Sequence, residues 1–212
     1  MTQLAEFTFD ENKASEVAFF FLQRAQEGGL PVTSSRLLQW LYLAEREAYA
    51  RHGEPLTGSR MRSGLHGPVL EDVRRLVATA RSQPGAVDGP WSRVVQAVPC
   101  VTRRASPRRA AVTLGASCPH RSSDDLLSLS ASDLDLLEAV WTDASSMSAK
   151  ALAKAFQNPR RFPESAVRRN EGFGPISLER VFDALGCDRA ETRELIAHIR
   201  RFEHVERVFR GL

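Results

Sequence analysis

Apolar residues recur at helical spacing along most of the chain and predict a mainly helical protein. The first helix is expected to follow Asp10, a residue type that caps helix N-termini well, and to end at Gly28. A second helix should run from about Thr33 to Gly53. A third should open at Pro68, because the first position of a helix needs no backbone N–H.

The pattern changes in the middle of the chain, where two short stretches favour β-structure. Residues 91–101 and 110–114 are joined by a short link, and we expect them to form a small antiparallel hairpin. A second helical group follows, in which Ser130–Asp133 and Asp188–Glu191 have the capping-box form. Further helix or turn starts are expected at Ser146 or Ser148, at Pro163 and at Ser177.

Together these elements predict a mainly α (α+β) fold in one compact domain spanning residues 1–212. That domain would hold a helical core at 10–81, the hairpin at about 91–116 and the second helical group at about 130–210. A chain of 212 residues is long enough to bury a sizeable core. We see neither an internal repeat nor a clear interdomain linker.

Composition places the chain among ordinary globular proteins, with 42% apolar and 26% charged residues. Three widely spaced cysteines suit a reducing compartment better than a disulfide framework. No secretory leader and no stretch long enough to span a bilayer is visible, so we expect a cytoplasmic protein that does not engage a membrane.

The net charge of +3 is mild, and the basic residues are almost all arginines. Arginine suits phosphate contacts as well as protein interfaces. The arginines are nevertheless spread over several segments, do not alternate with aromatic residues and follow no helix-turn-helix pattern. Nucleic acid is therefore an improbable partner on these grounds, and solvated surface arginines are the preferred interpretation.

The most informative block runs from Leu37 to Val69. A helix containing Trp40-Leu-Tyr-Leu43 is followed by a Gly53-Glu-Pro-Leu-Thr-Gly58 turn, a crossing segment, and Gly67-Pro-Val69. In this order the three pieces resemble the Panacea domain of SocA-like antitoxins. Its usual pattern is a Leu-Leu-Tyr-Leu helix, a Gly-x-Pro-Leu-Thr-Gly turn and a Gly-Pro-Val helix start. The motif positions are Gly53, Pro55, Gly58, Gly67, Pro68 and Val69.

Weaker similarity to the family continues beyond this block. Ser132–Trp141 and Ser148–Ala153 stand where the family has two further helices. A Thr-His pair is common in the following segment of the family, but Ala155-Phe-Gln157 occupies that position here. The departure puts in doubt a shared polar site in the second half of the chain.

The resemblance implies an antitoxin of a bacterial or phage toxin–antitoxin pair, with a role such as phage defence. It would bind a toxin encoded by an adjacent gene and neutralise it by direct contact, as a hetero-oligomer with the toxin or as a homo-oligomer. Members of the family pair with toxins of unrelated kinds, so the toxin's chemistry does not follow. The alternatives are a DNA-binding transcriptional regulator and an adaptor that delivers a substrate to a protease.

Candidate catalytic or metal-binding residues are few. Cys118 and His120 could supply two metal ligands, but no second ligand pair stands at zinc spacing. His198 and His204 fall on different faces of the last predicted helix. The sequence also lacks a glycine-rich phosphate loop and a nucleophile–base arrangement. We therefore expect no enzyme activity, no cofactor and no bound metal.

His66 is the polar residue of greatest interest, because it directly precedes Gly67-Pro-Val69. It could face a partner or an anion, or it could pack against Trp40 or Tyr42 as a structural residue. Gly67 should serve a positive φ or a close approach. Interfaces concentrate arginine and aromatic anchors, which suggests a toxin-binding surface around the turn. Its proposed members are Trp40, Tyr42, Arg60, Arg62, Leu65 and His66.

Overall fold

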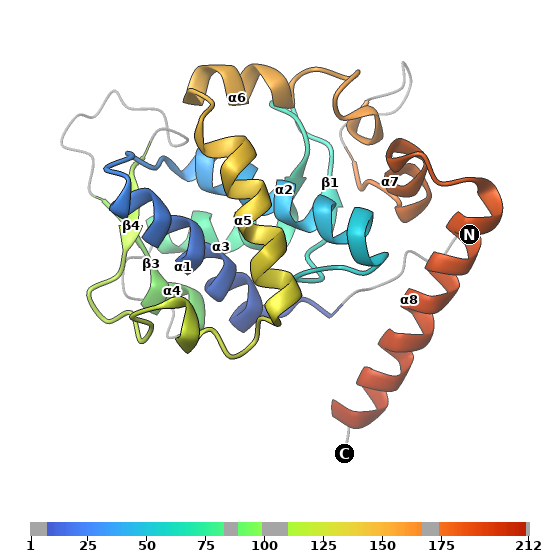
Figure 1. The fold of residues 1–212 in the computed structure, drawn as a ribbon, viewed down its shortest axis with the longest axis horizontal. Coiled ribbons are helices and arrows are strands. Elements are labelled where there is room, and N and C mark those ends of the chain that lie inside the picture. The colour runs from blue at the N-terminus through green and yellow to red at the C-terminus, as the bar shows by residue number, and fades with distance from the viewer. Residues whose placement is uncertain (1–7, 83–88, 99–109, 167–173, 211–212) are drawn as a thin grey trace.

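The computed structural model describes residues 8–82, 89–98, 110–166 and 174–210. Within these ranges the chain forms eight α-helices and two small antiparallel sheets of two strands each, which confirms the mainly α (α+β) prediction. Figure 1 shows helices α1, α2 and α5 stacked through the middle of the molecule, the β3–β4 pair at one side and α8 at the other.

The α-helices have the following bounds: α1 Glu11–Glu27, α2 Ser34–His52, α3 Glu71–Ser82, α4 Pro90–Val94, α5 Ala131–Ser145, α6 Ala149–Phe156, α7 Leu178–Leu185 and α8 Arg189–Arg210. The strands are β1 Met61–Arg62, β2 Val69–Leu70, β3 Val95–Ala97 and β4 Val112–Leu114. Two 3-10 turns lie at η2 Ser123–Asp125 and η3 Pro163–Ser165.

Local capping sets most helix ends where the sequence predicts them. The Asp10 carboxylate accepts the Lys13 N–H at 3.0 Å, and α2 begins after Thr33, whose hydroxyl accepts a backbone N–H. Gly53 ends α2 in the left-handed conformation, with a φ of 69°. Ser130 forms the expected capping box at the start of α5. These four helix ends confirm the sequence interpretation.

The third helix begins later than predicted. Val69 and Leu70 are not helical but pair with Arg62 and Met61 in an antiparallel ladder, and α3 starts only at Glu71. The prediction of a helix opening at Pro68 was therefore wrong. Pairing with β1, which ends seven residues before Val69, supplies backbone hydrogen bonds that a helix would otherwise have provided.

The predicted hairpin is present in shortened form. β3 and β4 pair antiparallel, with Val95 opposite Leu114. Residues 90–94 form helix α4 rather than a strand, because Pro90 stands at the first helical position, after the N-cap Gly89. The end of the first predicted stretch, residues 99–101, and the predicted link at 102–109 lie outside the described residues.

The core lies where α1, α2 and α5 pack together. Phe19, Phe20 and Phe21 of α1 are all buried, and Leu41 of α2 is 1% exposed. α5 packs against both α1 and α2, so the second helical group shares one apolar core with the first. Among the residues with described structure, none of the helices is both long and apolar enough to cross a bilayer.

Candidate partner-binding site

A buried carboxylate holds the turn that follows α2. Glu45, fully inaccessible to solvent, accepts the Thr57 N–H at 2.9 Å and the Thr57 hydroxyl at 2.7 Å. Its other oxygen accepts the Gly58 N–H at 3.2 Å. The turn returns close to the start of α1, where the Asp10 N–H donates to the Thr57 carbonyl at 2.9 Å. These bonds attach residues 57–58 rigidly to the helical core.

The same environment shifts the titration of this carboxyl group. Burial raises the pKa of the Glu45 carboxyl to about 7, although the hydrogen bonds from Thr57 and Gly58 favour its charged form and oppose the rise. Glu45 shares its helix face with Leu41, Ala44 and Ala48, all of which are buried. A single acid on an otherwise apolar face was a signal in the sequence, and our interpretation missed it.

Strand β1 leads from this turn and is bonded on both sides. It pairs with β2, and its Met61 carbonyl accepts the Ile176 N–H at 2.9 Å. Just beyond β1, the Ser63 N–H donates to the Gly174 carbonyl, also at 2.9 Å. The crossing segment therefore lies between β2 and residues 174–176, a segment more than a hundred positions away in the chain.

Arg60 is exposed and Arg62 is partly exposed, and both are ion-paired with the first turn of α3. Arg60 contacts Asp72 at 2.9 Å, and Arg62 contacts Glu71 at 3.5 Å. Burial would raise the pKa of the Asp72 carboxyl, but hydrogen bonds and charge from Arg60 together lower it below its ordinary value. Both arginines thus help to fix the crossing segment, and much of their charge is offset within the chain.

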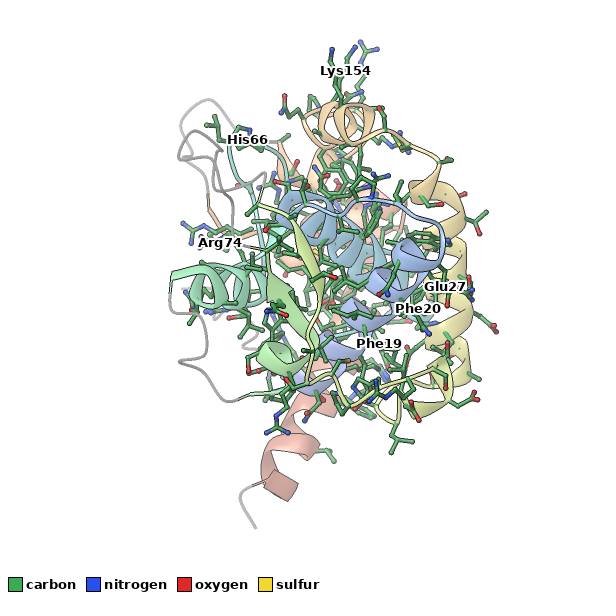
Figure 2. The ribbon with its side chains drawn as sticks, turned by 90° about the vertical axis from the view of Figure 1, so that its left-hand side faces the viewer. Phe19, Phe20, Glu27, His66, Arg74 and Lys154 are labelled. Carbon is green, nitrogen blue, oxygen red and sulfur yellow. The ribbon has the colours of Figure 1, made fainter. Side chains whose placement is uncertain are left out.

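The tip of the crossing segment faces solvent. Leu65 is 70% exposed, and His66 is exposed as well. Figure 2 shows His66 at the edge of the molecule, away from the labelled core residues Phe19 and Phe20. His66 therefore does not pack against Trp40 or Tyr42, which was the structural alternative.

Gly67 anchors one side of this tip. Its φ is 100°, and a Cβ at this position would lie 2.3 Å from the Phe156 carbonyl oxygen at the end of α6. Both predicted reasons for a glycine, positive φ and close approach, are confirmed. The neighbouring Pro68 is buried and Val69 belongs to β2. The tip of residues 64–67 is thus an exposed loop on a rigid base.

The two aromatic residues assigned to the surface lie in the core instead. Trp40 and Tyr42 are both 0% exposed. Trp40 packs against Phe21 and Trp141, so it has no access to a partner. The prediction that Trp40 and Tyr42 belong to the contact surface is therefore wrong. The other four proposed members, Arg60, Arg62, Leu65 and His66, reach solvent.

Tyr42 has a partner that the sequence did not reveal. Its hydroxyl donates to Glu164 at 2.9 Å, and Arg46 donates to the same carboxylate oxygen at 2.9 Å. Burial first, and then the Glu164 charge, raise the pKa of the Tyr42 hydroxyl well above its ordinary value. Glu164, 1% exposed, joins η3 to α2. The sequence held no cue to this pairing across 122 positions.

A pocket of about 210 Å³ is lined by residues of α2, α5 and α6. Its lining includes apolar residues such as Leu152, Phe156 and Phe162 and charged residues of both signs, Arg46, Glu47, Asp143 and Arg161. This mixed lining selects no single ligand chemistry.

No group of three or more potential ligands for a metal ion occurs among the described residues. Cys118 is buried, with its thiol beside the His120 carbonyl, and the His120 ring packs edge-on against Phe19. His198 contacts Glu54 at 2.8 Å, whereas the side chain of His204 lies outside the described residues.

The described residues thus define a helical protein whose motif forms a clamped, partly exposed loop. A family model for the SocA-like antitoxin, Panacea domain, matches residues 37–160. This segment is more than half of the chain and contains the whole loop, and the chain belongs to the SocA-like antitoxin family. No curated protein and no solved structure matches the chain.

Proposed function

We propose that this protein is the antitoxin of a bacterial or phage toxin–antitoxin pair and neutralises a cognate toxin by direct binding in the cytoplasm. Membership of the antitoxin family supports the role as an antitoxin. The geometry around the motif supports neutralisation by direct binding. The carrying observation is that the crossing segment between the two glycine-containing motif pieces forms an exposed tip, Leu65-His66, on a base immobilised by Glu45 and by the close approach of Gly67 to Phe156.

A rigid tip suits recognition of a protein, because little conformational entropy is lost when a preorganised loop is bound. Leu65 offers an apolar side chain; Arg62 lies on β1, and Arg60 directly precedes that strand. We propose Leu65 and His66 as the contacting residues, with Arg60 and Arg62 at the rim of the interface.

The protein itself would then act as a binding partner and not as an enzyme. DNA binding through this loop is less favoured, because the charges of Arg60 and Arg62 are offset by Asp72 and Glu71. Binding that relies on phosphate contacts needs basic groups free to replace counterions.

The test is co-expression with the product of the adjacent open reading frame. Leu65→Asp and His66→Ala should weaken both growth rescue and co-purification, while circular dichroism stays at the wild-type spectrum. Leu127→Asp is the matched control, since Leu127 is 90% exposed on a different loop. Equal rescue by Leu65→Asp, His66→Ala and wild type would exclude this surface. Failure of the wild-type protein to bind or rescue would exclude the antitoxin role with this partner.

A further inference from the structure

Helix α6 presents positive charge to solvent on its outer side. Lys150 and Lys154 are exposed and lie one helical turn apart, so they share a face of the helix. Each stands two positions, or about 200° around the helix, from a buried residue, Leu152 or Phe156. The apolar side of α6 therefore packs towards the core and the lysines point away from it, as Figure 2 shows for Lys154.

Two arginines extend this charge beyond the helix. Arg160 and Arg161 are exposed in the turn that follows α6. Asn158 fixes the turn, since its side-chain oxygen accepts the Arg160 N–H at 2.9 Å and its carbonyl accepts the Arg161 N–H at 3.0 Å. None of these cations forms an ion pair within the part of the chain that the structure describes. We call the four residues together the α6 basic face: Lys150, Lys154, Arg160 and Arg161.

The acids around the α6 basic face offset little of its charge. The sequence has no acidic residue between Asp143 and Glu164, and Glu164 is buried and already bonded within the core. Asp143 lines the same pocket as Arg161. Glu47, which also lines that pocket, contacts Arg51 at 2.6 Å. Most of the positive charge is therefore left for a partner.

The α6 basic face adjoins the exposed tip of the crossing segment. The close approach of Gly67 to the Phe156 carbonyl holds the tip against the end of α6. Figure 2 shows His66 and Lys154 towards the same end of the molecule. Leu65, which is 70% exposed, adds an apolar group beside these cations. A complementary surface would be apolar opposite Leu65 and acidic opposite α6.

A protein fits this combination better than a nucleic acid does. Phosphate contacts would use the cations but would leave the apolar side chain of Leu65 without a role. Single-stranded nucleic acids stack their bases on aromatic side chains, and the aromatic residues of this region, Phe156 and Phe162, are buried. A second copy of the chain would meet this surface with the same sign of charge if the two faces packed together.

We propose that the toxin docks an acidic surface against the α6 basic face, beside the Leu65-His66 tip. This inference rests on the proposed function and adds the chemistry of the partner's surface to it. Exposed lysines are strongly hydrated point charges on flexible chains. Such charges accelerate the encounter of two proteins more than they prolong the complex, and salt screens their effect.

The experiment measures association and dissociation rates of the full-length protein with the product of the adjacent open reading frame, used as the purified probe. Lys150→Glu/Lys154→Glu should lower the association rate constant at least about tenfold at low salt, and the difference from wild type should shrink as salt is added. Arg160→Glu should lower it as well. Circular dichroism and light scattering establish that each variant is folded and report its oligomeric state.

The matched control is Arg189→Glu/Arg200→Glu. It changes the net charge by the same amount at two exposed positions of α8, which Figure 1 shows at a different side of the molecule from α6. It should associate at close to the wild-type rate. An equal loss in this control would overturn the inference, because net charge alone would then explain the effect.

Wild-type association rates in folded Lys150→Glu/Lys154→Glu and Arg160→Glu would overturn the inference while leaving the antitoxin role intact. If these variants instead lost binding to a labelled DNA duplex that wild type binds, the face would belong to a nucleic-acid site. A wild-type dimer that Lys150→Glu/Lys154→Glu makes monomeric would assign the face to a second copy and overturn the inference too. Failure of the wild-type protein itself to bind the probe would overturn the proposed function, and this inference with it.

Discussion

The buried carboxylate of Glu45 should make stability depend on pH in an unusual direction. Its pKa is about 7 in the folded protein and close to the ordinary 4.5 when the chain unfolds. Between pH 4.5 and about 7, the Glu45 carboxyl group keeps its proton in the folded state and has lost it in the unfolded chain. Stability should therefore fall as pH rises from 4.5 to 7 and level off above 7, the reverse of an acid stabilised in its charged form.

The magnitude follows from the size of the shift. A rise from 4.5 to about 7 corresponds to about 3 kcal/mol of stability lost across this interval. That is a substantial part of the roughly 5–15 kcal/mol that separates folded and unfolded states of a typical protein. The depressed pKa of Asp72 acts in the opposite sense, but only as pH falls below the ordinary carboxyl range.

Denaturant unfolding followed by tryptophan fluorescence is a suitable assay, because Trp40 and Trp91 are buried. Wild type and Glu45→Gln are compared at several pH values between 4.5 and 8 at constant salt. The difference in unfolding free energy between the two should change by about 3 kcal/mol, in favour of wild type at low pH. Glutamine does not titrate, so Glu45→Gln removes the contribution of Glu45 to the pH dependence of stability and leaves the contributions of all other groups.

A difference that stays constant from pH 4.5 to 8 would refute the reasoning. It would mean that the hydrogen bonds from Thr57 and Gly58 stabilise the charged carboxylate enough to cancel the effect of burial. Glu45→Ala provides a second measurement, since it leaves buried donors of Thr57 and Gly58 without an acceptor. It should cost about 2–5 kcal/mol, with the larger loss at low pH, where wild type gains from the protonated carboxyl group.

Two further predictions concern packing. Leu41→Asp should unfold or insolubilise the protein, because an unpaired charge at a site 1% exposed costs several kcal/mol; a wild-type thermal melt would show that this face is not core. Gly67→Ala should lower the unfolding free energy more than Gly186→Ala does, by a margin of at least about 1 kcal/mol in chemical denaturation. Both glycines have positive φ, but only Gly67 would meet a backbone oxygen, that of Phe156, so equal losses would contradict a close approach.

Helix limits could be predicted from the sequence wherever the decisive contacts are local. The carboxylate of Asp10 caps the helix that begins one residue later, and Gly53 ends α2 because it adopts the left-handed conformation without steric cost. The Gly-Pro-Val piece was misleading because the contact that decides its structure is not local. Pro68 carries a genuine local helix-start signal, but the pairing of Val69 with Arg62 is not local, and it prevailed.

The candidate site was predictable only in part. The tip at Leu65-His66 is exposed, as an interaction surface requires, but Trp40 and Tyr42 are fully buried. A motif gives the order of residues along a helix, and in a helix covered on several sides even the flanking positions are buried. Only the packing of α5, α6 and η3 around α2 revealed this.

What the sequence by itself determined is the set of helices apart from α4, most of their ends, the family and the glycine requirement at position 67. These depend on interactions within about four residues, or on a motif read directly from the chain. The tertiary structure decided which side chains face solvent and which acids act as clamps. Glu45 reaches across the turn to Thr57, and Glu164 joins Tyr42 across 122 positions. Such contacts form only when distant segments are brought together, and their partners are set by the packed core rather than by any local pattern.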